Sequence, residues 1–443
     1  MKIDVQAKAI FLRAIESYPA HEWDAFLEGA CLDNAELLER VRSLLKSHDA
    51  NDEFFDRYDV AERPGTEIGP YKLLQQIGDG GFGVVYMAEQ LRPMRRKVAI
   101  KVIKPGMDTK EVIARFEAER QALATMDHPN IAKIFDGGTT ERGRPYFVME
   151  LVHGVPITQF CDENGLQPEQ RIEIFTQVCE AIHHAHNHGI IHRDIKPSNV
   201  MVTSKDGKPV PKVIDFGVAK AIEQPLTPKT MFTAYGQMIG TPQYMSPEQA
   251  EMSLVEVDKR SDVYSLGVLL YELLTGTTPL QKEQIQQTAF ADLQRMICDV
   301  EPPKPSTRVS KLGDSSALIT EQRSLQPGTL EQQLSGDLDQ ITMMAIDKDR
   351  ARRYSSAVEF ADDLKRHLND RPVHARRPSA AYRVRKFMRR HRKKAWPALA
   401  SFGAALLLVS VLIGMIAARQ AWKAQQIQES AEEATRMVNE AGK

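Results

Sequence analysis

The sequence predicts an α+β fold in which strands come first along the chain and long helices follow. Strand-like periodicity covers Tyr71–Ile77 and Val84–Glu89, and an apolar strand is predicted over Tyr146–Val152. A long helix is predicted over Pro168–His188, and helical patterns return over Gly336–Leu368. Strands in one part of the chain and helices in another are typical of an α+β domain.

The composition is that of an ordinary folded protein. The chain has 443 residues, of which 42% are apolar and 26% charged, enough for one large domain and smaller flanking segments. The apolar residues near the N-terminus are interrupted by charges too early for a signal peptide. No pair of cysteines has metal-ligand or redox spacing, so we expect reduced structural thiols at Cys31, Cys161, Cys179 and Cys298.

Two short segments precede the predicted strands. Residues 1–50 show apolar positions at helical spacing and predict a small helical extension, which packs on itself or on a partner. Residues 51–69 are polar and predict a linker. We therefore expect the main domain over residues 70–368.

A glycine-rich segment joins the first two predicted strands. It reads Gly78-Asp-Gly-Gly-Phe-Gly83, and the short strand Val98-Ala-Ile-Lys101 ends 23 residues after its first glycine. The same glycine spacing between a strand and a helix would indicate a dinucleotide-binding fold, but a strand follows here. A glycine-rich hairpin turn remains the alternative for this segment considered alone.

Two further motifs follow the long predicted helix. The first is His192-Arg-Asp-Ile-Lys-Pro-Ser-Asn199, and the second is Val213-Ile-Asp-Phe-Gly217. Five of the eight positions in the first motif match the catalytic loop of protein kinases, with a random chance of roughly one in three million per start. The chain therefore resembles the bacterial transmembrane serine/threonine protein kinases of the eukaryotic-like protein kinase superfamily.

The resemblance covers about two thirds of the chain, Tyr71–Leu368, and implies a bilobal protein-kinase fold. Such a fold has a small antiparallel β lobe and a larger helical lobe. In this chain it would carry the helical extension at the N-terminus and one C-terminal transmembrane helix.

The resemblance also implies catalytic roles. Asp194 would take the proton from a substrate hydroxyl, Lys196 would steady the γ-phosphate of ATP, and Asn199 and Asp215 would hold Mg²⁺. A lysine at position 196 resembles the serine/threonine branch of the family. Lys101 would contact the α- and β-phosphates.

Lys101 needs a carboxylate to position it. The predicted helix Thr109–Met126 contains several glutamates, and alignment to the family favours Glu119, with Glu117 as the alternative. A solvated helix face remains the other interpretation of any one of them.

The strand over Tyr146–Val152 would become the hinge that binds adenine. Met149 would line the back of the pocket, while the Glu150 carbonyl and the Val152 amide would bind the adenine edge. A buried strand is also consistent with its residues, since the hinge is both. The residues expected to contact ATP are Ile77, Gly78, Gly80, Gly83, Val85, Ala99, Lys101, Met149, Glu150, Val152 and Met201.

Residues 218–245 would form the activation segment. An arginine before the catalytic aspartate, here Arg193, usually pairs with a phosphate on that segment. Thr233 is the first candidate phosphosite and Thr230 the second, and an unmodified loop threonine is the alternative for both.

Three residues are expected to support the fold. Glu248 would pair with Arg353, and Asp262 would open the central helix of the large lobe and brace the catalytic loop. Residues 281–335 are polar and predict irregular structure.

The C-terminal part predicts a membrane anchor. Residues 395–418 contain no charge and would reach about 36 Å as a helix, against a bilayer core of about 30 Å. The preceding segment, residues 369–394, holds eleven Lys and Arg and no acid between 371 and 394. The positive-inside rule then places the kinase in the cytoplasm and the short tail, residues 419–443, outside the cell membrane. A nucleic-acid patch is the less favoured interpretation of the basic run.

The expected function is the transfer of the γ-phosphate of MgATP to Ser/Thr hydroxyls of proteins, as part of signal transduction. Autophosphorylation in trans would be favoured by homodimers in the membrane plane, and no nucleic acid partner is expected. A pseudokinase scaffold is one alternative, disfavoured by intact Lys101, Asp194, Asn199 and Asp215. A small-molecule phosphotransferase of similar fold is another, but such enzymes usually lack the segment from Thr241-Pro to Glu248.

Overall fold

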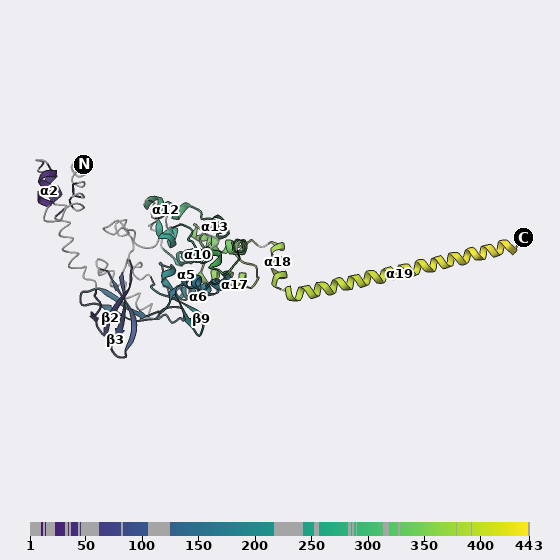
Figure 1. Cartoon of the computed structure of the whole chain (residues 1–443), viewed down its shortest axis with the longest axis horizontal. Helices are drawn as coiled ribbons and strands as arrows, with labels where there is room; N and C mark the ends of the chain where they lie inside the picture. Colours follow the sequence, from purple (N-terminus) through teal and green to yellow (C-terminus); the bar gives the residue numbers. More distant parts are fainter. Residues whose placement is uncertain are drawn as a thin grey trace. The chain divides into compact units, whose positions relative to one another are not determined.

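The structure is a computed structural model of the whole chain (Figure 1). It divides into two compact units, the first comprising Met1–Val155, His184–Asp194 and Asn199–Thr241, and the second Pro156–His183, Ile195–Ser198 and Pro242–Lys443. The residues that it describes are 10–11, 14, 23–31, 34, 37–42, 45, 62–80, 83–104, 125–216, 242–251, 257–281, 285, 288, 290–312, 319–326, 328–377, 379–390 and 392–441.

A six-stranded sheet forms most of the first unit. All its pairs are antiparallel, in the order β1-β2-β3-β4-β6-β5. β3 and β4 pair without a register shift, whereas β2 carries two irregularities against β3. The strands are β1 (Glu67–Ile68), β2 (Tyr71–Asp79), β3 (Gly83–Gln90), β4 (Arg96–Ile103), β5 (Ile134–Thr139) and β6 (Pro145–Glu150).

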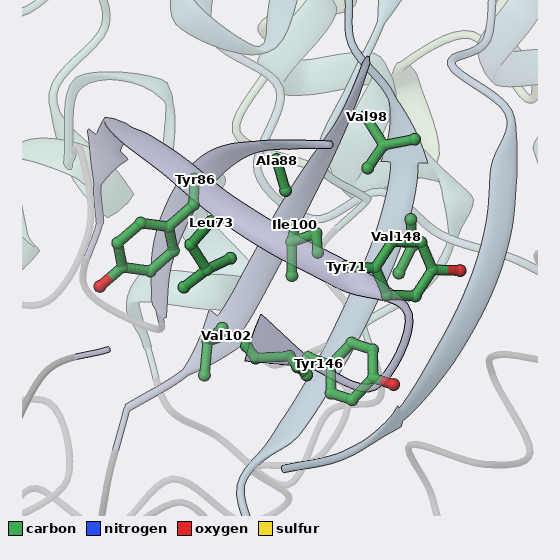
Figure 2. Close-up of a cluster of buried hydrophobic side chains, with 10 residues drawn as sticks. Tyr71, Leu73, Tyr86, Ala88, Val98, Ile100, Val102, Tyr146 and Val148 are labelled. Atoms are coloured by element: carbon green, nitrogen blue, oxygen red, sulfur yellow. The ribbon is translucent and has the colours of Figure 1, made fainter. Parts of the chain in front are cut away.

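One face of this sheet carries an apolar core (Figure 2). Because side chains alternate between the two faces of a strand, every second residue of β3, β4 and β6 enters this core. Ile100 and Val148 are fully buried and paired across β4 and β6. The core cluster consists of Ile68, Tyr71, Leu73, Tyr86, Ala88, Val98, Ile100, Val102, Tyr146 and Val148.

A β-hairpin follows the motif His192–Asn199. β8 (Val200–Lys205) pairs with β9 (Lys208–Val213), and Asp206 and Gly207 form the turn. Both turn residues have positive φ, 52° and 73°, which is the backbone of the tight hairpin turn that Asp-Gly favours. The hairpin brings its two ends, Asn199 and Ile214, within a backbone hydrogen bond of 2.9 Å.

The N-terminal segment contains a small apolar cluster of its own. Helix α2 (Trp23–Ala30) contributes the buried Leu27, with Trp23 and Phe26 packed against the cluster. Its other buried members are Ala14, Cys31, Leu37, Val41 and Leu45. The apolar positions at helical spacing therefore meet one another, as amphipathic helices require.

Helices make up most of the second unit. After the short α5 (Ile157–Glu163) and the long α6 (Pro168–Asn187), the chain forms α9 (Pro247–Ala250), α10 (Lys259–Thr275), α12 (Phe290–Asp299), α13 (Pro305–Lys311), α15 (Thr329–Leu334), α16 (Asp337–Ala345), α17 (Ala357–Leu368), α18 (Ala380–Arg390) and α19 (Arg392–Ala441).

Helix α10 is the most deeply buried of these helices. The side chain of Asp258 caps its N-terminus by accepting a bond from the Arg260 amide at 2.7 Å. At its C-terminal end two buried arginines, Arg171 and Arg323, donate to the carbonyl of Leu273 at 3.2 and 3.0 Å. Guanidinium groups suit this position because helix C-terminal carbonyls lack partners within the helix.

The prediction of irregular structure over residues 281–335 was wrong for three segments, which form α12, α13 and α15. Helix α12 buries Leu293 and Ile297, four residues apart on one face. Helix α13 is held by Asp339, which accepts bonds from the Ser306 amide and hydroxyl at 2.9 and 2.6 Å. These helices depend on contacts with distant residues, which a polar sequence window does not reveal.

The C-terminal segment ends in one long helix. α19 contains 50 residues and includes the whole charge-free stretch, residues 395–418 (Figure 1). Among the described residues it is the one helix long and apolar enough to cross a membrane, by length and composition. Residues predicted as a separate tail after Ala418 continue the same helix as far as Ala441.

Candidate functional site

Four residues of the predicted nucleotide site lie on one face of the sheet. Val85 pairs with Lys101 across β3 and β4, and Ala99 pairs with Met149 across β4 and β6. The residues that alternate with them belong to the core cluster, so these four side chains lie on the opposite face. Strand alternation thus presents a lysine and apolar side chains together, as a site for a nucleotide requires.

Lys101 forms an ion pair with Asp215. Its Nζ lies 2.5 Å from Asp215 Oδ1, and the two side chains are 14% and 25% exposed. A pair that is largely removed from water interacts more strongly than one on the surface. Glu119, the partner predicted for Lys101, lies outside the described residues, and the contact with Asp215 is not among the contacts predicted from the sequence.

Asn199, the last residue of the motif His192–Asn199, connects that motif to the hairpin. Its Nδ2 donates to the Asp194 carbonyl at 2.8 Å and to Asp194 Oδ2 at 3.0 Å. The backbone carbonyl of Asn199 accepts from the backbone amide of Ile214, the residue before Asp215. The hairpin therefore brings Asp215 back toward Asp194 and Asn199, which precede it in the sequence by the length of the hairpin or more.

The buried side chain of His192 supports this arrangement through hydrogen bonds. The ring is fully buried, and its Nδ1 accepts from the Asp194 amide at 3.3 Å. Its Nε2 then carries the proton and donates to the Ile214 carbonyl at 3.1 Å. Phe216 packs on the same ring with centroids 4.7 Å apart. A neutral histidine thus joins the residues that flank Asp194 and Asp215.

The backbone at two of these positions is unusual. Arg193 and Asp215 have φ of 62° and 63°, a region that residues with a Cβ seldom occupy. Such conformations cost about 1–3 kcal/mol each and persist only where neighbouring contacts enforce them. Arg193 precedes Asp194, and Asp215 follows Ile214. The hydrogen bonds of His192 to the Asp194 amide and the Ile214 carbonyl therefore hold the backbone next to both residues.

The glycine-rich segment begins at the end of β2 and ends at the start of β3. A Cβ added at Gly83 would lie 2.6 Å from the Val102 carbonyl oxygen, so the pairing of β3 with β4 requires glycine there. At Gly78 and Gly80 the nearest atoms would lie at 3.6 and 3.7 Å, an ordinary contact. These two glycines are therefore not demanded by packing.

The other residues expected to contact ATP differ in their burial and in their hydrogen bonds. The Glu150 carboxylate accepts from Lys212 Nζ at 2.7 Å and from the Lys133 amide at 3.2 Å. Met201 and Val152 are half-buried, while Ile77 is 48% exposed. No sequence signal pointed to Lys212, because it is one lysine of a polar hairpin.

Some of the predicted residues belong to the other unit, and three lie outside the described residues. Lys196 belongs to the second unit, as does Asp262, which is fully buried in the first turn of α10. The candidate phosphosites Thr230 and Thr233 lie outside the described residues, as does Glu119.

Glu248 and Arg353 form a buried ion pair in the second unit. Arg353 donates to both carboxylate oxygens at 2.7 and 2.9 Å, and the Ser261 hydroxyl donates to Oε1 at 2.6 Å. Burial by itself would raise the pKa of Glu248, but the hydrogen bonds and the charge of Arg353 outweigh it and hold that pKa below its usual value.

The donor set fits a hard divalent cation. Asn199 and Asp215 offer amide and carboxylate oxygens, which Mg²⁺ prefers, and the hairpin holds the two residues at adjoining ends. Lys101 beside Asp215 adds a positive charge that suits a phosphate. The arrangement can therefore receive a magnesium nucleotide next to the carboxylate of Asp194.

The fold and the site together define a protein kinase. The sequence matches the protein kinase domain family over residues 71–367, about two thirds of the chain, and the chain belongs to that family. The predicted α+β fold, an antiparallel β lobe with a helical lobe, is confirmed. The crystal structure of a double mutant of the Mycobacterium tuberculosis PknI kinase domain is similar with a TM-score of 0.50 and 25% identity, covering 70% of this chain and 100% of that one.

Curated relatives are bacterial serine/threonine kinases. The chain is 35% identical to the serine/threonine-protein kinase PknB of Mycobacterium tuberculosis over 310 residues, 69% of this chain and 44% of that protein. It is 36% identical to a probable serine/threonine-protein kinase of Corynebacterium efficiens over 300 residues, 66% of this chain and 40% of that protein. The matches thus span less than half the length of these relatives.

Proposed function

We propose that this protein transfers the γ-phosphate of MgATP to serine or threonine hydroxyls of proteins. The single observation that carries the proposal is the grouping of Lys101, Asp194, Asn199 and Asp215. Lys101 pairs with Asp215, Asn199 donates to Asp194, and the Asn199 carbonyl accepts from the amide of Ile214, the residue before Asp215. Membership of the protein kinase family and the serine/threonine kinases among its relatives support the same activity.

Asp194 would orient the attacking hydroxyl and accept its proton. Its carboxylate is positioned by Asn199 Nδ2, and its backbone amide is held by His192. Transfer of a phosphoryl group needs little covalent help from the protein, so the main contribution of these residues is positioning and charge neutralisation.

Lys101 and Asp215 would bind the nucleotide phosphates together. In the structure they neutralise each other, and with ATP bound each would meet the opposite charge of a phosphate or a cation. Asn199 and Asp215 would hold Mg²⁺, which would supply positive charge to offset the charge of the phosphates. Val85, Ala99 and Met149 would cover the adenine on the same face of the sheet.

The finer parts of the proposal concern the flanking segments. Residues 395–418 would anchor the protein in the cell membrane, since α19 is long and apolar enough, with the kinase domain over 70–368 in the cytoplasm. Autophosphorylation on Thr233 or Thr230, by a second copy in the membrane plane, would supply the phosphate that Arg193 pairs with.

The test is a phosphorylation assay on the full chain in detergent micelles, with radioactive ATP, Mg²⁺ and a generic basic protein. Asp194→Asn should lower the rate by about 10²–10⁴-fold, because it removes the proton acceptor but little volume. Asp206→Asn is the matched control, since it makes the same change at the exposed hairpin turn, where asparagine also tolerates positive φ.

Equal rates for the wild type and Asp194→Asn would refute the activity. Phosphopeptide mapping of the same samples tests the finer proposal separately. Phosphate on Thr230 or Thr233 in the wild type alone supports autophosphorylation, and an active kinase without phosphate on the activation segment rejects that part only.

A further inference from the structure

Helix α18 is attached to the second unit by one face. Lys386 Nζ lies 2.7 Å from Asp337 Oδ2, and the Tyr382 hydroxyl donates to Asp337 Oδ1 at 3.1 Å. Lys386, Tyr382 and Asp337 are 5%, 4% and 7% exposed. The same tyrosine oxygen accepts from the Val373 amide at 3.2 Å. Because Lys386 follows Tyr382 by one helical turn, a single face of α18 makes this attachment.

The opposite face of α18 is apolar and exposed. Val384, Phe387 and Met388 are 60%, 54% and 40% exposed, and they follow the i, i+3, i+4 spacing of one helix face. At about 100° per residue, this face points away from that of Tyr382 and Lys386. Neighbouring exposed apolar side chains of this kind mark a candidate site for contact with a membrane or a protein.

Arginines border the apolar face on both sides. On the helix circumference Arg383 and Arg390 lie along one edge and Arg385 along the other, and all three are exposed. Helix α18 contains no acidic residue. An apolar face bordered by arginines is typical of helices that lie in the interface of an anionic membrane.

We propose that α18 lies on an anionic lipid surface, with Val384, Phe387 and Met388 inserted at the boundary between headgroups and acyl chains. The Tyr382 and Lys386 face then holds the second unit of the kinase against the membrane. The proposal rests on the membrane anchoring proposed above, since α19 begins two residues after α18 ends.

Charge favours lipid over a second copy of this chain. Two copies of α18 packed face to face would bring arginines of the same sign together, and no carboxylate on the helix would offset them. Anionic headgroups supply the opposite charge and attract basic residues near the surface.

The test uses the full chain in vesicles of phosphatidylcholine alone or mixed with phosphatidylglycerol. A polarity-sensitive fluorophore is attached to Val384→Cys, and quenching by lipids with a nitroxide near the headgroup end of the acyl chain is measured. Gln332→Cys, exposed on α15, is the matched control, and the chain without an added cysteine gives background labelling. Flotation of the vesicles tests anchoring independently.

In anionic vesicles we expect at least about twofold stronger quenching at position 384 than at 332. Arg383→Gln, Arg385→Gln and Arg390→Gln together should reduce this difference, since they remove charge from exposed positions. Equal quenching at both positions in a chain that floats would overturn the proposal and leave the anchor intact. A chain that does not float refutes the anchor and this proposal with it. A fluorophore at 384 that is shielded in detergent and becomes exposed on dilution would indicate a second copy instead of lipid.

Discussion

Replacement of Arg353 by alanine should strongly destabilise the helical unit. Arg353 is buried, and its guanidinium uses all five of its N–H groups. Two bonds go to Glu248 Oε1 and Oε2 at 2.7 and 2.9 Å, and the others go to the carbonyls of Asp347, Arg260 and Lys348 at 2.7, 3.2 and 3.2 Å.

The magnitude follows from what remains after the substitution. Glu248 would stay buried without its cation, and removal of one partner of a buried pair costs about 3–5 kcal/mol. Three backbone carbonyls would also lose a donor, so the upper part of this range is expected. The Ser261 hydroxyl, 2.6 Å from Glu248, is the partner that stays.

The assay is urea unfolding of the full chain in micelles, followed by circular dichroism. Arg352→Ala is the control at the adjacent position, because Arg352 pairs with Asp349 at 3.6 Å while 74% exposed and should cost no more than about 1 kcal/mol. An equally small loss of stability for Arg353→Ala and Arg352→Ala would show that the buried pair does not stabilise the unit.

The pH dependence provides a second readout of this pair. The pKa of Glu248 is lowered in the folded protein, so its contribution to stability is present above the unfolded pKa. This stabilising contribution is lost as the pH falls through the lowered pKa that Glu248 has in the folded protein. The difference between wild type and Arg353→Ala should therefore shrink below about pH 4.

Two other predictions concern the glycine segment and the α18 attachment. Gly83→Ala should destabilise the sheet by about 1–3 kcal/mol, because its Cβ would lie 2.6 Å from the Val102 carbonyl oxygen. Gly78→Ala should cost less than half of that, since its Cβ would make only ordinary contacts. Thermal unfolding measures both costs, and equal costs would contradict this prediction. Asp337→Asn should weaken the bond to Lys386 and increase protease cleavage in the segment between α17 and α18. Burial would raise the pKa of Asp337, but Lys386, the Tyr382 hydroxyl and the nearby His367 ring hold that pKa well below its usual value. The wild-type attachment should therefore persist at neutral pH and be lost only as the pH falls below the ordinary aspartate range, so release already at pH 6 would contradict the prediction.

Much of the fold was predictable because its signals are local. The strands over Tyr71–Ile77 and Val84–Glu89 correspond to β2 and β3, since alternation records which face of a sheet is buried. The helix over Pro168–His188 corresponds to α6, which ends at Asn187. The residues proposed for catalysis were also named from short motifs, in which neighbouring positions carry the information together.

Contacts between distant residues were less accessible from the sequence. The helices within residues 281–335 were missed because contacts such as that of Ser306 with Asp339 are not visible in a polar window. Arg171 and Arg323 belong to no recognisable sequence motif, yet they are buried at the end of α10. A charged residue can be buried only if its partners are assembled by the rest of the fold.

The sequence by itself therefore determined the fold class, the family and the residues proposed to bind and transfer phosphate. The tertiary structure decided which of these residues touch: Lys101 meets Asp215, and Asn199 meets Asp194. It also decided that the basic segment before α19 has two unlike faces, one attached through Lys386 and one exposed. The physical reason is that composition sets the charge of a segment, whereas burial and pairing depend on residues far away in the chain.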